Sequence, residues 1–127
     1  MPSMQIAQKR YGNARILVLT GRIDNGTSEA FKTGLGTHVA DCRAGGDCLV
    51  LDFSGIDYIS SVGLRALMLV ARQSREQGGT IVVAALQPVV REIFEISRFN
   101  LVFECFGGVR EALEKVSPAG LAAYDAV

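Results

Sequence analysis

The sequence carries no excess of charge of either sign and no long apolar run. Its 13 basic and 13 acidic residues give a formal net charge of zero, so the release of counterions would contribute little to nucleic-acid binding. The same balance disfavours an anionic membrane surface. No apolar stretch approaches the roughly 20 residues of a membrane span. We therefore expect neither a nucleic acid nor a membrane as the direct partner.

Cysteine and histidine are also scarce. The three cysteines, Cys42, Cys48 and Cys105, are odd in number, and residues 1–10 contain no uninterrupted apolar segment of the signal-peptide kind. We therefore expect a reducing, cytoplasmic location. Zinc sites need four ligands and pair them at closer spacing than Cys42 and Cys48, so no metal and no cofactor is expected. The single histidine, His38, is expected at the surface near a helix C-terminus.

The motifs of common hydrolases and phosphate-binding enzymes are missing. Ser60 and Ser61 do not stand in a G-x-S-x-G elbow. The glycines of residues 34–37 lack the spacing and the lysine of a phosphate-binding loop. The remaining enzymatic hypothesis is a cation site formed by three carboxylates at one end of the sheet, Asp24, Asp52 and Asp57. Carboxylates near strand ends more often cap turns and helices, so we predict no catalytic residues and no enzyme.

Strand and helix patterns alternate along most of the chain. Strands are predicted over residues 4–9, 14–20, 48–53, 80–86 and 101–106, and helices over residues 27–39, 61–77, from 88 onward, and 109–116. The order β-β-α-β-α-β-α-β-α predicts a single α/β domain over residues 1–116. Its mixed sheet would begin with an antiparallel hairpin and pack against about four helices. Residues 117–127 show no clear pattern, and we expect a loosely ordered tail there.

The most informative segment, residues 49–69, reads LVLDFSGIDYISSVGLRALML. It predicts a short apolar strand, a tight polar turn, two serines and an apolar helix. Ser61 falls where a helix N-cap is expected, above unpaired backbone N–H groups that favour negative charge. A phosphate would be tolerated there, which makes Ser61 a candidate on/off switch. The alternative is a plain capping serine.

The helix that follows is apolar on more than one side. Leu64, Leu67, Met68 and Ala71 form one stripe, and Val62, Ala66 and Leu69 begin a second. A helix that is apolar on two faces is either buried under neighbouring helices or binds a partner. Both interpretations remain open at this point.

Three segments carry a resemblance to a known family. They are LTGRID at residues 19–24, LDFSGIDYISSVGL at residues 51–64, and the strand and helix within residues 80–97. The chain resembles the STAS domain family over about residues 4–116, and specifically its small bacterial anti-sigma-factor antagonists (anti-anti-sigma factors). The resemblance implies a STAS-type fold over residues 1–116.

The resemblance also implies a function. Such antagonists bind an anti-sigma factor that is a serine protein kinase of the Bergerat ATPase type, and this binding frees a sigma factor for transcription. Phosphorylation of the serine two positions before the Gly-Leu pair, here Ser61, would release the antagonist, and a serine phosphatase would restore it. Ser60 is the alternative acceptor. The alternative function is a STAS subunit of a transporter or of a stress-sensing assembly that binds constitutively.

Two residues depart from the family pattern. Many relatives have an acidic residue where Ser60 stands, and relatives often have glycine near position 98, where this chain has Arg98.

The expected partner-binding residues surround the switch at one end of the sheet: Asp24, Asn25, Thr27, Tyr58, Ser60, Ser61, Gly63 and Leu64.

Overall fold

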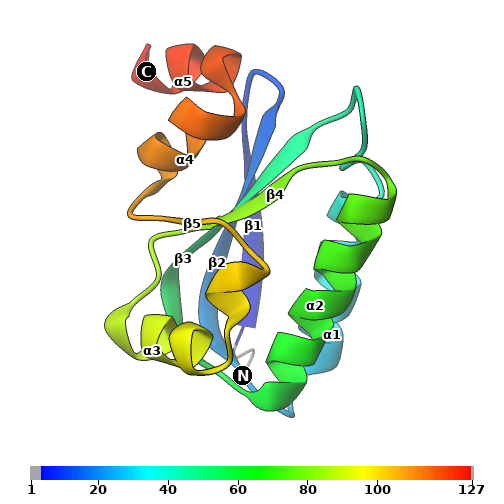
Figure 1. Cartoon of the computed structure of the whole chain (residues 1–127), viewed down its shortest axis with the longest axis vertical. Coiled ribbons are helices and arrows are strands. Elements are labelled where there is room, and N and C mark those ends of the chain that lie inside the picture. Colours follow the sequence, from blue (N-terminus) through cyan, green and yellow to red (C-terminus); the bar gives the residue numbers. More distant parts are fainter. Residues whose placement is uncertain (1–3, 127) are drawn as a thin grey trace.

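The computed structural model describes residues 4–126 and is organised by one five-stranded sheet (Figure 1). Its strands are β1 (Met4–Tyr11), β2 (Ala14–Ile23), β3 (Cys48–Ile59), β4 (Ile81–Ala84) and β5 (Cys105–Phe106). They lie side by side in sequence order, with β1 antiparallel to β2 and the other pairs parallel. The predicted α/β class, the mixed sheet and the antiparallel hairpin are confirmed.

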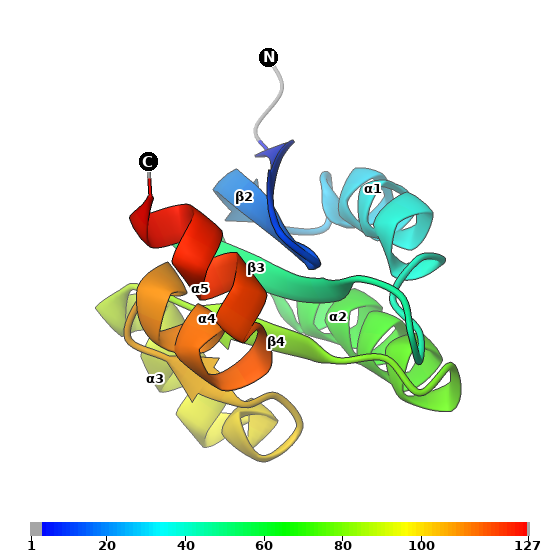
Figure 2. The same cartoon turned by 90° about the horizontal axis from the view of Figure 1, so that it is seen from above.

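Helices cover both faces of the sheet. They are α1 (Ser28–Val39), α2 (Ser61–Glu76), α3 (Pro88–Ile96), α4 (Val109–Val116) and α5 (Pro118–Asp125), with a 3₁₀ turn, η1, at Phe99–Leu101. The larger core joins one face to α1, α2 and α3, and a smaller core joins the other face to α4 and α5. Figure 2 shows α1 and α2 on one side of the sheet and α4 and α5 on the other. No helix within residues 4–126 is long and apolar enough to cross a membrane.

The central strand β3 is buried on both faces because its side chains alternate between the two cores. Leu49 and Leu51 face the larger core, and Cys48 and Val50 face the smaller one. A continuous apolar run suits a parallel strand that is covered on both sides. The apolar pattern of residues 48–53 therefore correctly predicted the centre of the sheet.

The predicted tight turn after Phe53 is wrong, because β3 continues to Ile59. Ile56 and Ile59 are buried in the larger core and pair with Gly21 and Ile23 of β2, across register irregularities in the β2–β3 pairing. Gly55 permits this close approach, because a Cβ there would lie 2.8 Å from the Leu19 carbonyl oxygen. The extension carries the β3 end to the same edge as the end of β2.

The C-terminal tail is the second correction, because residues 118–125 form helix α5 rather than a loosely ordered segment. Ser117 caps it by accepting a hydrogen bond from the Gly120 N–H at 2.9 Å. Tyr124 meets Tyr11 of β1 edge to face, with ring centroids 5.2 Å apart. Arg110 of α4 also pairs with Asp125 at 3.0 Å. These contacts tie α5 to the hairpin and to α4.

The remaining differences concern lengths and counts. The strand predicted over residues 101–106 is reduced to Cys105–Phe106, preceded by η1, and β4 ends at Ala84 rather than at residue 86. The described residues contain five helices, one more than expected, because of α5. Pro88 occupies the first turn of α3, directly after the N-cap residue Gln87, as predicted.

Candidate functional site

The junction between β3 and α2 places the two serines in different roles. Ser60 is the N-cap: its backbone is extended, and its Oγ accepts a hydrogen bond from the Gly63 N–H at 3.1 Å. Ser61 is the first residue of the helix. The prediction that Ser61 is the N-cap is therefore wrong. The Ser60 N–H still donates to the Ile23 carbonyl at 2.7 Å, so hydrogen bonding to β2 continues one residue beyond the end of β3 at Ile59.

Ser61 is exposed at the start of α2. Within residues 4–126 its hydroxyl forms no side-chain hydrogen bond, and the first turn of α2 contains no acidic residue. The helix dipole places partial positive charge at this end. An added phosphate would therefore meet a favourable field and no neighbouring carboxylate within the first turn.

The β2–α1 loop is closed by hydrogen bonds between Asp24 and Thr27. The Asp24 N–H donates to Thr27 Oγ1 at 2.9 Å, and Asp24 Oδ1 accepts from the Gly26 N–H at 2.9 Å and the Thr27 N–H at 3.2 Å. The Thr27 hydroxyl donates to the Arg22 carbonyl at 2.9 Å. Thr27, the first residue of the predicted helix, occupies the N-cap position of α1, but its hydroxyl does not cap the helix.

Arg22 is the functional candidate that sequence reasoning missed. Its Nε donates to Asp24 Oδ2 at 3.1 Å, and its guanidinium carbon lies 4.6 Å from the centre of the Tyr58 ring. Partial burial opposes ionisation of Asp24, but hydrogen bonds from Arg22, Gly26 and Thr27 lower the pKa of this carboxyl. Arg22 lies opposite Tyr58 because of the register between β2 and β3. The local sequence pattern does not give this register, so the contact could not be predicted from the sequence.

An open hollow of about 410 Å³ lies beside the C-terminal ends of β2 and β3. The hollow is lined by Arg22, Asp24, Asn25, Gly26, Tyr58 and Ser60. The structure therefore brings together four of the predicted partner-binding residues, with Ser61 next in sequence. Three others lie below the surface: Thr27 and Leu64 are each 8% exposed, and Gly63 is buried.

Gly63 is buried for a packing reason. A Cβ at this position would lie 2.6 Å from Ile23 Cγ2 and 2.9 Å from Ile59 Cγ1. Distances this short force a rearrangement of the two isoleucines. Gly63 therefore lets the first turn of α2 sit directly on the ends of β2 and β3, which fixes the position of Ser61.

The two stripes of α2 have different surroundings. Leu64, Leu67 and Ala71 are buried, whereas Val62 is 43% and Leu69 is 42% exposed. The exposed pair lines a groove of about 90 Å³ between α1 and α2, together with Ser28, Glu29, Lys32, Arg65 and Ala66. In the second stripe, Val62 and Leu69 therefore lie at the surface, whereas Ala66 is buried.

Other candidate residues have structural partners. Asp52 Oδ1 accepts from the Ser54 N–H at 2.9 Å, and no group of three metal-ligating side chains forms within the described chain. The carboxylates Asp24, Asp52 and Asp57 are therefore not assembled into a cation site. Cys42 is buried, with its sulfur 3.1 Å from both Ser74 Oγ and the Thr80 carbonyl, and all three cysteines are free.

A second polar cluster lies at the opposite end of the parallel strands and surrounds Arg15. This side chain is 9% exposed and donates to Asp47 Oδ2 at 2.7 Å and Asp41 Oδ2 at 3.1 Å. Its Nη1 also lies 3.2 Å from His38 Nδ1, which makes that nitrogen an acceptor. Burial, assisted by the charge of Arg15, lowers the pKa of His38. The cluster holds the hairpin to the loop before β3.

The chain is a small α/β domain, because its mixed sheet is covered by helices on both faces. Its candidate binding surface lies at one end of the sheet, where the polar hollow meets the start of α2. The chain belongs to the STAS domain family, whose family model matches residues 5–112. The family resemblance drawn from the sequence motifs is confirmed.

Individual relatives agree with this assignment. A Bordetella bronchiseptica protein named as an anti-sigma factor antagonist, BtrV, is 37% identical over 100 residues, covering 79% of this chain and 84% of the relative. The crystal structure of an anti-sigma factor antagonist from Mycobacterium paratuberculosis has a TM-score of 0.76 at 25% identity, covering 90% and 94% of the two chains. The phosphorylated form of the Bacillus cell fate determinant SpoIIAA has the same fold, with a TM-score of 0.63 at 16% identity and coverage of 88% and 99%.

Proposed function

We propose that this chain is an anti-sigma-factor antagonist that works as a phosphorylation-controlled interaction switch in the cytoplasm. The observation that carries the proposal is the 37% identity with a relative named as such an antagonist, over 79% of this chain. The unmodified chain would bind an anti-sigma factor that is also a serine kinase and so free a sigma factor. Phosphorylation would dissociate the pair, and a serine phosphatase would reset the chain.

Ser61 is the proposed acceptor because its hydroxyl is exposed and forms no side-chain hydrogen bond in the described chain. Ser60, the alternative, is half-buried and its Oγ already accepts from the Gly63 N–H. A kinase that reached Ser60 would have to disturb the cap of α2. This difference in access supports Ser61.

The expected effect of the phosphate is local. It adds about −1.5 to −2 charges to a chain whose formal net charge is zero. The start of α2 can accept that charge without refolding, because unpaired N–H groups and the helix dipole favour it. The modified serine would then repel an acidic partner surface and obstruct close packing beside the hollow. SpoIIAA, which shares the fold, has been determined in a phosphorylated form.

The proposed partner surface combines two parts. The polar hollow with Arg22, Asp24 and Tyr58 supplies hydrogen bonds and charge. The groove next to it exposes Val62 and Leu69 between α1 and α2. Interfaces that combine an apolar centre with a polar rim are typical of specific protein complexes. Ser61 lies between the two parts along the chain, where a phosphate would affect both.

Site-resolved mass spectrometry of the chain from its native cells tests the switch directly. A single phosphate on Ser61 is expected, and phosphate on Ser60 would correct the acceptor. Binding of the purified anti-sigma factor is then measured by calorimetry for wild type, Ser61→Ala and Ser61→Asp. Ser61→Ala should bind and Ser61→Asp should not. Equal binding of all three variants, together with no phosphate under any growth condition, would contradict the proposal.

A further inference from the structure

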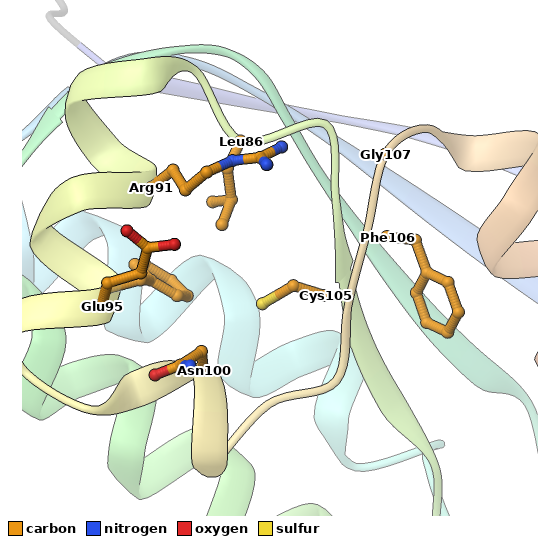
Figure 3. Close-up of a pocket in the computed structure, with 8 residues that line it drawn as sticks. Leu86, Arg91, Glu95, Asn100, Cys105, Phe106 and Gly107 are labelled. Atoms are coloured by element: carbon orange, nitrogen blue, oxygen red, sulfur yellow. The ribbon is translucent and has the colours of Figure 1, made fainter.

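A pocket between α3, η1 and β5, away from the β3–α2 junction, takes no part in the proposed switch. It has a volume of about 200 Å³ and is enclosed by α3, η1 and β5. Its polar lining comes from Arg91, Glu95, Asn100 and Cys105, and its apolar floor from Leu86 and Phe94. Figure 3 shows the charged side chains on the helix side and the Cys105 sulfur pointing in from β5, while the Phe106 ring points away.

Three of the four polar side chains around this pocket have no side-chain partner within residues 4–126, whereas the Cys105 thiol donates to the Phe103 carbonyl at 3.4 Å. Arg91 and Glu95 lie one helical turn apart on α3, yet no ion pair joins them, and neither is paired with another residue in the described chain. The Asn100 amide likewise makes no side-chain hydrogen bond there. All three residues are exposed. A cation, a carboxylate and an amide are thus available to a ligand at one pocket mouth.

The backbone around the pocket is strained. Within residues 4–126, the non-glycine residues with positive φ are Ala85, at 62°, and Arg98, at 61°. Ala85 directly precedes Leu86 of the pocket floor, and Arg98 connects α3 to η1, so they bracket the helix that carries Arg91 and Glu95. Strained residues persist where the surrounding structure holds them and often mark ligand sites.

The chemistry of the mouth selects a ligand class. A simple anion would be attracted by Arg91 and repelled by Glu95. A simple cation would be attracted by Glu95 and repelled by Arg91. A ligand with both charges satisfies both groups: a carboxylate accepts paired hydrogen bonds from the guanidinium, an ammonium group donates to the Glu95 carboxylate, and the Asn100 amide can serve either. The floor exposes apolar atoms of Leu86, which is 8% exposed and lies above the fully buried Phe94, and it suits a compact apolar side chain.

We propose that this pocket binds a small zwitterion, an α-amino acid with an apolar side chain. Cys105 contributes surface rather than covalent chemistry, because burial raises the pKa of its thiol and keeps it protonated at neutral pH. The proposal does not depend on the phosphorylation switch, since no pocket residue belongs to the β3–α2 junction.

The test is a titration of the full chain with L-leucine, followed by amide NMR. Saturable shifts are expected for residues of α3, η1 and β5, with a dissociation constant on the order of 0.1–1 mM. 4-Methylpentanoate, which is leucine without the ammonium group, and isopentylamine, which is leucine without the carboxylate, should each bind at least about tenfold more weakly than L-leucine. Absence of saturable shifts, or equal binding of 4-methylpentanoate, overturns the proposal.

Variants assign the roles of the two charges. Arg91→Gln and Glu95→Gln should each weaken L-leucine binding about tenfold or more, and the amide spectra of both variants should remain dispersed. Arg72→Gln, an exposed arginine on α2 outside the pocket, is the matched control and should bind as wild type does. Unchanged affinity in both pocket variants contradicts the assignment. None of these measurements involves Ser61 or a partner, so their failure would leave the proposed function unaffected.

Discussion

Replacing Ser60 by alanine separates the structural serine from the proposed switch serine. The change removes the Oγ that accepts from the Gly63 N–H at 3.1 Å. The backbone hydrogen bonds from Ser60 to Ile23 and from Leu64 to Ser60 do not involve the side chain and should remain. Ser60→Ala therefore leaves one N–H in the first turn of α2 without its partner.

The expected loss follows from measured N-cap replacements. Substituting a capping serine by alanine costs about 1 kcal/mol of stability, within a range of about 0.5–2 kcal/mol. Ser61→Ala is the matched control, because Ser61 is exposed and has no side-chain hydrogen bond in the described chain. Its free energy of unfolding should change by less than about 0.5 kcal/mol. Ser60→Asp should keep most of the stability because aspartate is an equally good N-cap.

Urea unfolding measures all three variants. With a denaturant slope of about 2 kcal/mol/M, a loss of about 1 kcal/mol lowers the unfolding midpoint by about 0.5 M. The slope itself should not change. Equal losses for Ser60→Ala and Ser61→Ala, or a larger loss for Ser61→Ala, would refute the assignment of Ser60 as the cap.

Three further predictions concern the surface groove, the Arg15 cluster and α5. Leu69→Arg should change the free energy of unfolding in urea by less than about 0.5 kcal/mol, because Leu69 is 42% exposed. The same variant should abolish partner binding. The core control Leu67→Ala should lower the free energy of unfolding by about 2–5 kcal/mol. The lowered pKa of His38 means that the unfolded chain takes up the proton first, so stability is full above about pH 6.5 and falls as the pH drops toward the folded pKa. Melting temperatures between about pH 7 and pH 5 should show this fall, and His38→Gln should flatten it. Tyr124→Ala should cost about 1 kcal/mol or more in thermal unfolding, because it removes the edge-to-face contact with Tyr11; no change would mean that α5 is only loosely attached.

Local signals in the sequence determined the order of the elements and several of their ends. The apolar run of residues 48–53 indicated the buried central strand, and β3 begins at Cys48 as predicted. Gly78 ends α2 with a φ of +73°, and Pro88 begins α3. Glycine and proline act through their own backbone geometry, within one or two residues. Such signals can be read without knowing what packs nearby.

Most of the candidate surface could also be predicted, but the roles within it could not. The hollow does bring Asp24, Asn25, Tyr58 and Ser60 together, because the ends of parallel neighbouring strands meet at one edge of a sheet. The distinction between Ser60 and Ser61 depends on one further hydrogen bond between Ser60 and Ile23. That bond is set by the register of two strands far apart in sequence.

Tertiary contacts alone decided the remaining features. The α5 helix has a weak sequence pattern and is held by Tyr11, Arg110 and the hairpin turn. The pocket between α3 and β5 combines residues from segments whose own patterns indicate nothing about a ligand. Capping and periodicity act over a few residues, whereas strand register and packing join residues separated by tens of positions. The sequence by itself therefore determined the family and the order of strands and helices, and the packed structure decided which serine caps the helix and which is exposed.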